Sequence, residues 1–211
     1  MLIPLKKLIA KYNLRPKGVL HLGGHWAEEA KDYAACGIDR MIFVEADPDT
    51  FQELGRRIAK YPKAMAVEAC LSNVDGDTVT FHRSNNEGQS SSFLALGTHA
   101  VVHPEVKYIG DLQLKTHRID TLYNAGALPG FDECDFVNLD LQGAELLALK
   151  GMGELLHRFK AVYVEVNKNE LYKGCPLVDD IDEYLDRFGF ERVELEWCGN
   201  FGWGDGFYIK K

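Results

Sequence analysis

The sequence predicts an α/β fold built on a mostly parallel, doubly wound sheet with one antiparallel strand near the C-terminus. Short runs rich in apolar and β-branched residues alternate with helical patterns along the chain. Several of these runs are apolar throughout, as strands buried in a parallel sheet are. The chain ends in two strand-like runs separated by a glycine-rich loop. This ending is typical of a β-hairpin and supplies the reversed strand.

The predicted parallel strands are residues 18–22, 41–45, 64–70, 135–139 and 161–166, and the terminal hairpin joins residues 192–197 to residues 206–210. We expect the aromatic side chains around this hairpin to belong to the core: Trp197, Phe201, Trp203 and Tyr208. Residues 83–110 are predicted to form a long polar loop, and loops of this length in compact domains are often functional.

Capping residues mark the predicted helices. Asp47 is a predicted N-cap, followed by Pro48 at the first helical position. Another helix follows Gly143 and ends at a glycine, and a later one begins near Leu177. Residues 1–17 are predicted to form a helical extension of a single domain that spans residues 1–211.

Composition limits the class of protein. The chain has 211 residues, and its 24 Lys and Arg against 32 Asp and Glu give a net charge of −8. A net acidic chain lacks the general attraction for phosphate backbones, so nucleic acid is not an expected partner. Lysines interrupt the apolar residues of the first helix, so no membrane segment is predicted. The five cysteines show no disulfide or metal-ligand spacing, which favours reduced thiols and a cytoplasmic protein.

The most informative residues follow predicted strands, because ligands of open α/β sheets bind outside the carboxyl ends of the strands. Gly23 and Gly24 follow the first strand, where paired glycines would let backbone N–H groups approach a ligand. Glu45 ends the next strand, 22 positions after Gly23. This spacing matches that of an acidic side chain that accepts both hydroxyls of a nucleotide ribose. Together these residues predict a ligand that contains adenosine.

The residues after Gly23 distinguish between adenosine-containing cofactors. They do not form the Gly-x-Gly-x-x-Gly turn that seats a pyrophosphate, so an NAD-dependent oxidoreductase is less favoured. S-adenosylmethionine carries the same ribose diol without a phosphate. We therefore expect this cofactor and a methyl transfer, in which the protein aligns a nucleophile with the sulfonium methyl group and excludes water.

A hydroxyl acceptor also needs a catalytic group that takes its proton. Asp140 and Glu165, each at the end of a predicted strand, are the expected catalytic carboxylates, and His21 or His25 are alternatives if they lie within hydrogen-bonding reach. Structural roles compete with these assignments. Asp140 is also expected to cap a helix, and Glu145 is a first-turn carboxylate that the helix dipole favours.

The histidines do not form a recognisable metal site. His21 and His25 are four positions apart, but the glycines between them argue against a helix that presents both to a metal. The other histidines are scattered, and surface or hydrogen-bonded positions are expected for them. No metal ligands are therefore assigned, although a divalent ion held partly by substrate hydroxyls would leave little trace in the sequence.

Three stretches of the sequence resemble the FkbM family of S-adenosylmethionine-dependent methyltransferases: residues 21–29, 43–48 and 135–151. The most specific of them is the Asp-Leu-Gln-Gly-Ala-Glu run that begins at Asp140. Residues 163–167, 171–174, 179–190 and 203–205 are similar to later parts of the family. The resemblance implies a Rossmann-like class I methyltransferase fold and O-methylation of a hydroxyl on a sugar, glycan or small metabolite.

The resemblance also implies a set of residues around the cofactor: His21, Gly23, Gly24, Glu45, Ser72, Asp140 and Gln142. The first three form the first cofactor loop, Glu45 binds the ribose, and Ser72 lies near the adenine. Asp140 and Gln142 face the methyl group and the acceptor, and the serines at 90–92 lie near the site. Two positions depart from the family, since His21 stands where many members have an acidic residue and Ala27 where a second glycine is common.

Those departures leave a second function open, a non-catalytic module that keeps the fold and binds the cofactor or a partner. They also leave open whether Asp140 or Glu28 binds the methionine amino group. The acceptor, a metal requirement and the oligomeric state are not decided by the sequence, because specificity lies in variable loops whose composition does not encode a substrate.

Overall fold

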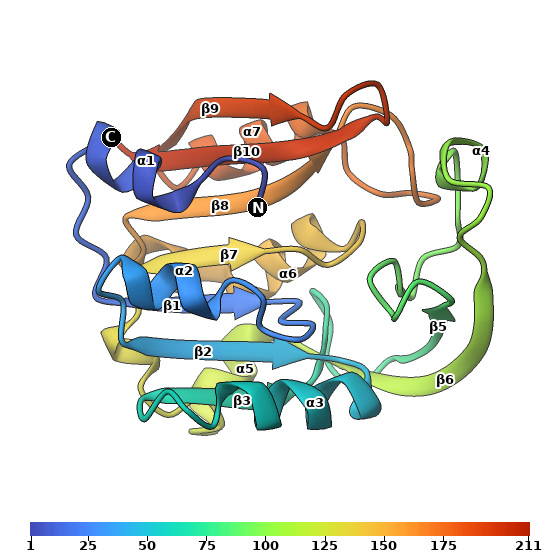
Figure 1. Cartoon of the computed structure of the whole chain (residues 1–211), viewed down its shortest axis with the longest axis horizontal. Helices are drawn as coiled ribbons and strands as arrows, with labels where there is room; N and C mark the ends of the chain where they lie inside the picture. The colour runs from blue at the N-terminus through green and yellow to red at the C-terminus, as the bar shows by residue number, and fades with distance from the viewer.

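The computed structural model describes all 211 residues and places a seven-stranded sheet between two layers of helices (Figure 1). The strand order is β3-β2-β1-β7-β8-β10-β9. One face is covered by α1 (Leu5–Lys11), α2 (Ala30–Ala35) and α3 (Pro48–Ile58). The other is covered by α5 (Ile119–Asn124), α6 (Glu145–Met152) and α7 (Val178–Asp186). Short helices complete the chain: α4 (His99–Val102), η1 (Phe131–Glu133) and η2 (Gly153–Arg158).

The main sheet confirms the predicted fold class. Its parallel strands are β1 (Gly18–Leu22), β2 (Arg40–Glu45), β3 (Ala64–Glu68), β7 (Phe136–Leu139) and β8 (Ala161–Asn167). The terminal hairpin joins β9 (Phe190–Trp197) to β10 (Trp203–Lys210). β10 lies between β8 and β9 and is antiparallel to both. The reversed strand is therefore one place in from the edge of the sheet.

Alternation along the strands divides the core into two parts. On β1, Leu20 and Leu22 pack into the cluster beneath α5, α6 and α7, whereas Val19 packs into the cluster beneath α1, α2 and α3. Because helices cover both faces, consecutive strand residues are all buried, which explains why these strands are apolar throughout. No helix of the chain is both long and apolar enough to cross a bilayer. All five cysteines are free.

The order of crossovers creates a crevice. From β1 the chain moves outward to β2 and β3, and it later returns to the opposite side of β1 to form β7 and β8. The carboxyl ends of β1 and β7 therefore lie at the point where the direction of winding reverses, which is where ligands bind in such sheets. The predicted helix after β2 also forms, since Asp47 caps α3 by accepting the N–H groups of Asp49 (2.9 Å) and Thr50 (3.2 Å).

The region between β3 and α5 differs from the prediction. Residues 64–70 form β3 and begin a separate strand, β4 (Cys70–Leu71), and the predicted loop at 83–110 includes parts of β5 (Thr78–Ser84) and β6 (Tyr108–His117). These strands form a second sheet in the order β4-β6-β5. Apolar residues alternate with polar ones along both strands, at Val79 and Phe81 in β5 and at Leu112 and Leu114 in β6, but the prediction did not use these short signals on either side of the polar loop. The ribbon carries the connecting segment out past the carboxyl ends of the main sheet (Figure 1).

Candidate active site

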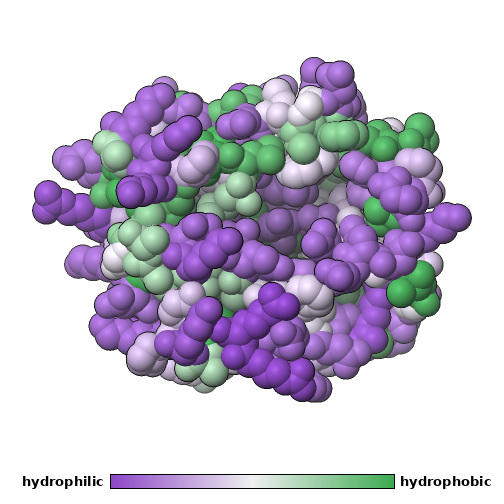
Figure 2. Space-filling model, in the orientation of Figure 1, coloured by the Kyte–Doolittle hydropathy of each residue, from purple (hydrophilic) through white to green (hydrophobic).

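A cavity of about 600 Å³ opens at the carboxyl ends of β1, β2, β7 and β8. Part of its wall comes from the segment between β5 and β6, which includes Ser90, Ser91 and His99. Figure 2 shows that this face of the molecule is hollowed near its middle and that the surface around the hollow is mostly hydrophilic. The cavity lies where the topology of the sheet predicts a ligand.

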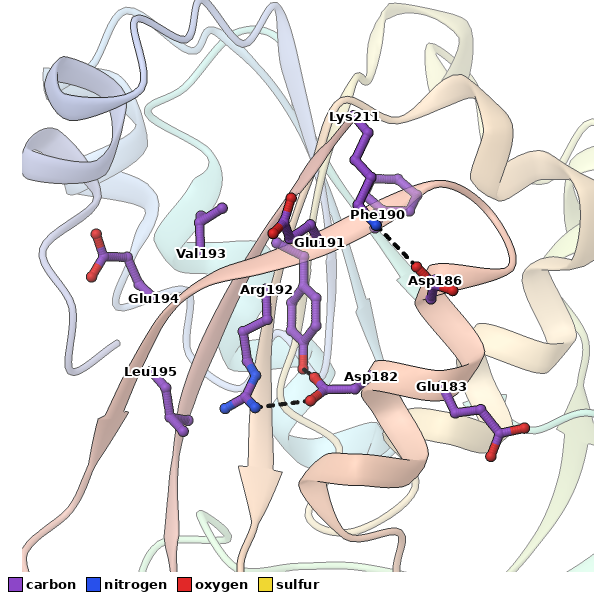
Figure 3. Close-up of a pocket in the computed structure, with 11 residues that line it drawn as sticks. Asp182, Glu183, Asp186, Phe190, Glu191, Arg192, Val193, Glu194, Leu195 and Lys211 are labelled. Atoms are coloured by element: carbon purple, nitrogen blue, oxygen red, sulfur yellow. Dashed lines mark hydrogen bonds and ion pairs between the residues drawn. The ribbon is translucent and has the colours of Figure 1, made fainter.

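A second, more open groove of about 540 Å³ lies between α7 and the outer strands β9 and β10 (Figure 3). Its polar groups satisfy one another: Asp182 accepts hydrogen bonds from Arg192 (2.8 Å) and from the hydroxyl of Tyr208 (2.7 Å). None of the residues expected to bind a ligand lines this groove. We therefore place the candidate site in the cavity at the strand ends.

The glycine turn after β1 is built for close packing. Gly23 has φ +81°, and a Cβ at this position would lie 1.7 Å from the carbonyl oxygen of Asp140. The N–H groups of Gly23 and Gly24 both donate to the carbonyl of Val44 at 2.9 Å. The expectation that these N–H groups approach a ligand is wrong, because they join β1 to β2 instead. Gly23 lines the cavity, whereas Gly24 packs against Phe43 and does not.

The backbone conformation at Ala27 bears on one of the two departures from the family pattern. Its φ is +56°, in the left-handed region that favours glycine. The backbone at this position therefore has the conformation that favours glycine, and this chain adopts it with alanine. His25, two residues earlier, also has a positive φ of +39°, and its N–H donates to the Oε2 atom of Glu45 at 2.9 Å.

Glu45 is fixed at the cavity wall by three backbone donors. Its Oε2 atom accepts from His25, and its Oε1 atom accepts from the N–H groups of Ala46 (2.9 Å) and Asp47 (3.0 Å). The side chain is only 9% exposed. Burial raises the pKa of Glu45, and the three N–H donors act in the opposite direction. The structure thus brings Glu45 to the position expected for the ribose ligand.

The His21 side chain is buried, and both of its ring nitrogens lie near a buried polar group. Its Nδ1 atom lies 3.1 Å from the Tyr33 hydroxyl and its Nε2 atom 3.4 Å from the Asn138 amide nitrogen, which also donates to that hydroxyl at 2.7 Å. Burial lowers the pKa of His21, so the ring is neutral at pH 7. Although His21 lines the cavity, its contacts tie β1 to β7 and α2. His25 is also engaged, through Glu28 and the carbonyl of Glu87, each at 2.9 Å.

Three carboxylates meet beside the cavity: one oxygen of each of Asp140, Glu145 and Glu165 lies within 4.8 Å of the others. Asp140 opens into the cavity after β7, and Glu165, on β8, lines the cavity with only 9% of its surface exposed. Desolvation raises the pKa of all three groups, to about 6 at Asp140, which is itself exposed to the cavity, and to about 7 at Glu145. The charge of Asp140 raises the pKa of Glu145 and Glu165 further, whereas Asp205 and Glu29 act on Asp140. The two expected catalytic carboxylates are therefore neighbours.

Glu145 has a different role from the one expected. The N-cap of α6 is Ala144, so the expectation that Asp140 caps this helix is wrong. Glu145 holds the turn instead, because its Oε1 atom accepts the N–H groups of Leu141 (2.8 Å) and Gly143 (3.1 Å). Its predicted first-turn position is confirmed, but the side chain is completely buried and its Oε2 atom has no hydrogen-bond partner.

A chain of hydrogen bonds fixes Asp140. The Gln142 amide donates to the Oδ1 atom of Asp140 at 2.6 Å, and the Tyr172 hydroxyl donates to the Gln142 side-chain oxygen at 2.5 Å. The Ser92 hydroxyl donates to the Gln142 backbone carbonyl at 2.9 Å. Tyr172 was not predicted as a site residue, but it lies in the 171–174 segment of the family resemblance and begins the 172–176 region expected, with residues 83–110, to hold acceptor specificity.

Other predicted residues lie differently. Ser72 does not line the cavity; its carbonyl packs against Gly151 of α6, while Ala69 occupies the wall near β3. Trp203, expected in the core, lines the cavity, and Phe201 is 43% exposed. Tyr208 is buried, as expected. His99, which had no predicted role, lines the cavity with a buried Nδ1 atom that has no partner.

Comparison with known sequences supports the resemblance. Residues 21–192 match the family described as the methyltransferase FkbM domain. The 2-O-methyltransferase NoeI of Sinorhizobium fredii is 23% identical over 163 residues, which cover 74% of this chain and 65% of that protein. The hexuronic acid methyltransferase AglP of Haloferax volcanii is 30% identical over 134 residues, which cover 63% of this chain and 49% of that protein. The chain thus spans less than two thirds of the length of either relative.

Solved structures confirm the fold. The magnesium protoporphyrin IX methyltransferase of Synechocystis with bound S-adenosylmethionine matches with a TM-score of 0.54 at 10% identity, covering 98% of this chain and 76% of that one. A putative tRNA (m1A22) methyltransferase of Streptococcus pneumoniae, in complex with S-adenosylmethionine, matches with a TM-score of 0.52 at 13% identity, covering 100% and 73%. At such identities the likeness concerns the fold alone, and it confirms the predicted Rossmann-like architecture.

Proposed function

The chain belongs to the FkbM methyltransferase family, and on this premise we propose that it is an S-adenosylmethionine-dependent O-methyltransferase that acts on a sugar or glycan hydroxyl. The observation that carries the proposal is convergence: Gly23, Glu45 and Asp140, from three separate strand ends, line one cavity at the switch point of the sheet. The names of the two relatives, a 2-O-methyltransferase and a hexuronic acid methyltransferase, support a sugar acceptor.

The residues present suit the cofactor. Glu45 offers carboxylate oxygens at the cavity wall, as a ribose diol requires, and Glu28 on the same wall suits the methionine amino group. When bound, S-adenosylmethionine supplies an electrophilic methyl group. A dinucleotide fits less well, because the N–H groups of Gly23 and Gly24 are already paired with Val44 and leave no cradle for a pyrophosphate.

Asp140 and Glu165 are assigned to the acceptor. We infer that they bind and orient the acceptor hydroxyl, and that one of the two carboxylates takes its single proton as the oxygen bonds to the methyl carbon and the bond from that carbon to sulfur breaks, with S-adenosylhomocysteine as the leaving group. Both line the cavity that holds Glu45, and the bonds from Tyr172 through Gln142 hold Asp140 in one orientation. Proximity and orientation are the main requirements of a displacement at a methyl carbon, and a fixed carboxylate meets them.

The non-catalytic alternative has less support. The two departures that suggested it, His21 and Ala27, both have structural explanations. His21 contacts Tyr33 and Asn138 through its two ring nitrogens, and Ala27 has the positive φ that a glycine at this position would favour. Neither residue obstructs the turn that Gly23 makes beside the cavity.

Thermal unfolding with S-adenosylhomocysteine tests the proposal, with NADH as the comparison ligand. Ligand at about one hundred times its dissociation constant adds about 2.7 kcal/mol to the free energy of unfolding, a shift of several degrees for a chain of this size. We expect this shift with S-adenosylhomocysteine alone. A shift with NADH alone would favour an oxidoreductase, and no shift with either ligand would favour the non-catalytic module.

A further inference from the structure

We infer that Asp140, Glu145 and Glu165 form a binding site for a hard divalent cation, Mg²⁺, Mn²⁺ or Ca²⁺, beside the cavity. Their carboxylate oxygens lie within 4.8 Å of one another. Two ligands of one ion cannot be farther apart than twice the bond length, which is about 4.0–4.2 Å for Mg²⁺ and about 4.6–5.2 Å for Ca²⁺. The three oxygens therefore need at most a small closure to hold one ion, and this upper limit on their spacing does not distinguish among the three cations.

Glu145 supplies an independent reason to expect a ligand. Its side chain is 0% exposed, and its Oε1 atom is already held by two backbone N–H groups. Its Oε2 atom is buried without any hydrogen-bond partner. A buried carboxylate oxygen without a donor costs free energy, and a bound cation would remove that cost.

Negative charge predominates around the three groups. No lysine, arginine or histidine side chain forms a salt bridge with Asp140, Glu145 or Glu165, and their hydrogen-bond donors are neutral amides. The N-terminal ammonium of Met1 acts on Asp140 and Glu165 from a distance, but it is paired with Glu29 at 3.5 Å. Desolvation raises the pKa of all three groups and the charge of Asp140 raises it further at Glu145 and Glu165, and a divalent cation would relieve both effects. Because the donors are all carboxylate oxygens, the site favours hard cations over zinc or copper.

One consequence rests on the proposed function. A cation at this position would leave coordination positions open toward the cavity, where neighbouring hydroxyls of a sugar acceptor can bind it. Coordination would lower the pKa of the acceptor hydroxyl and assist the proton transfer assigned to Asp140 and Glu165. The binding site itself does not depend on this step.

Titration calorimetry of the protein with MnCl₂, MgCl₂ and CaCl₂, without cofactor, tests the inference. Glu145→Gln keeps an oxygen for the two backbone donors and replaces the unpartnered oxygen with an amide nitrogen. We expect it to weaken binding of the tightest of these ions at least tenfold. Glu165→Gln is the second variant. The Glu165 side chain has no hydrogen bond to lose, so we expect this variant to fold and to show a similar loss of cation affinity even if Glu145→Gln is unstable.

Asp205→Asn is the matched control. Asp205 lines the same cavity and its charge acts on Glu165, but its oxygens lie outside the group of three. We expect its cation affinity to stay within threefold of the parent. The inference is overturned if no ion binds at millimolar concentration, or if Asp205→Asn weakens binding as much as Glu145→Gln, which would indicate a diffuse attraction to negative charge. Cofactor binding, measured separately with S-adenosylhomocysteine, reports on the proposed function alone.

Discussion

Gly23 and Asp140 are in direct backbone contact: a Cβ on Gly23 would lie 1.7 Å from the Asp140 carbonyl oxygen. The N–H of Asp140 donates to the carbonyl of Leu22, one residue earlier, at 2.9 Å. The turn after β1 and the turn after β7 therefore form one unit. A change in the cofactor-side turn must displace the acceptor-side carboxylate, because no space separates them.

Gly23→Ala should destabilise the fold by about 3 kcal/mol or more, since it adds a backbone clash to the strain of a φ of +81°. Gly37→Ala is the control. Gly37 has a similar φ of +77°, but nothing lies within 4 Å of its added Cβ, so only a conformational cost of about 1 kcal/mol is expected. Urea unfolding of the two variants measures the difference, and equal losses would show that the contact with Asp140 relaxes easily.

Glu45→Gln should weaken S-adenosylhomocysteine binding by about 10- to 150-fold, which corresponds to the free energy of one hydrogen bond to a charged group. Binding to the parent should weaken on acidification, because only the ionised carboxylate accepts from both ribose hydroxyls. Burial raises the pKa of Glu45, so this loss should begin at a higher pH than for an ordinary carboxyl. Calorimetry across the acidic range measures both effects.

Glu68→Gln is the control for this prediction. Glu68 lies at the exposed end of the neighbouring strand, so this variant should bind S-adenosylhomocysteine like the parent. An unchanged affinity in Glu45→Gln would remove Glu45 from the cofactor site.

Asp140→Asn and Glu165→Gln should each lower the rate of methyl transfer by about 10²- to 10⁴-fold, the range for loss of an acid–base group. Their affinity for S-adenosylhomocysteine should stay within a few fold of the parent. Transfer of a labelled methyl group to hexuronate-containing glycans and to a panel of other sugars measures the rate. Glu196→Gln, an exposed carboxylate on β9, controls for a general loss of negative charge. Turnover at the parent rate in both site variants would show that neither carboxylate takes the proton.

Tyr172→Phe should reduce kcat by about 3- to 10-fold, equivalent to the free energy of one hydrogen bond, because Gln142 loses the donor that orients it toward Asp140. KM for the cofactor should not change, since Tyr172 acts through Gln142. Tyr108→Phe removes a comparable bond, from the hydroxyl to the Leu94 carbonyl at 2.7 Å, outside the cavity wall. Equal effects of the two variants on kcat would indicate a general loosening of the fold rather than positioning.

His21 should make the fold sensitive to acid. Burial lowers its pKa below the unfolded value near 6.5, so its contribution to stability is complete above that pH and is lost as the pH falls below it. The loss can reach about 1.4 kcal/mol per pH unit. His21→Gln should therefore lose less stability than the parent between pH 7.5 and 5.5 in urea unfolding. His117→Gln, a half-exposed histidine at the end of β6, should follow the parent, and a parent-like slope in His21→Gln would contradict the assignment.

The main elements of the fold were predictable because their signals are local. The apolar runs of β1, β2, β7 and β8, and the Asp47-Pro48 cap of α3, are decided by residues close together in the sequence. The prediction missed β5 and β6 although a local signal is present, since Val79 and Phe81 alternate with polar residues in β5 and Leu112 and Leu114 do so in β6. The local signal does not show that these two strands pair with each other across the intervening loop and form a separate sheet with β4.

By itself, the sequence determined the parallel sheet with its reversed strand, the family, and the positions of Glu45 and Asp140 at strand ends, whereas Glu165 lies inside β8, two residues before its end. Only the tertiary structure decided how these residues are used. It assigned the N–H groups of Gly23 and Gly24 to Val44 and brought the three carboxylates into one cluster. The physical reason is that these contacts join residues far apart in the chain. Their distances depend on the order in which the crossovers place the strands, and no local pattern encodes that order.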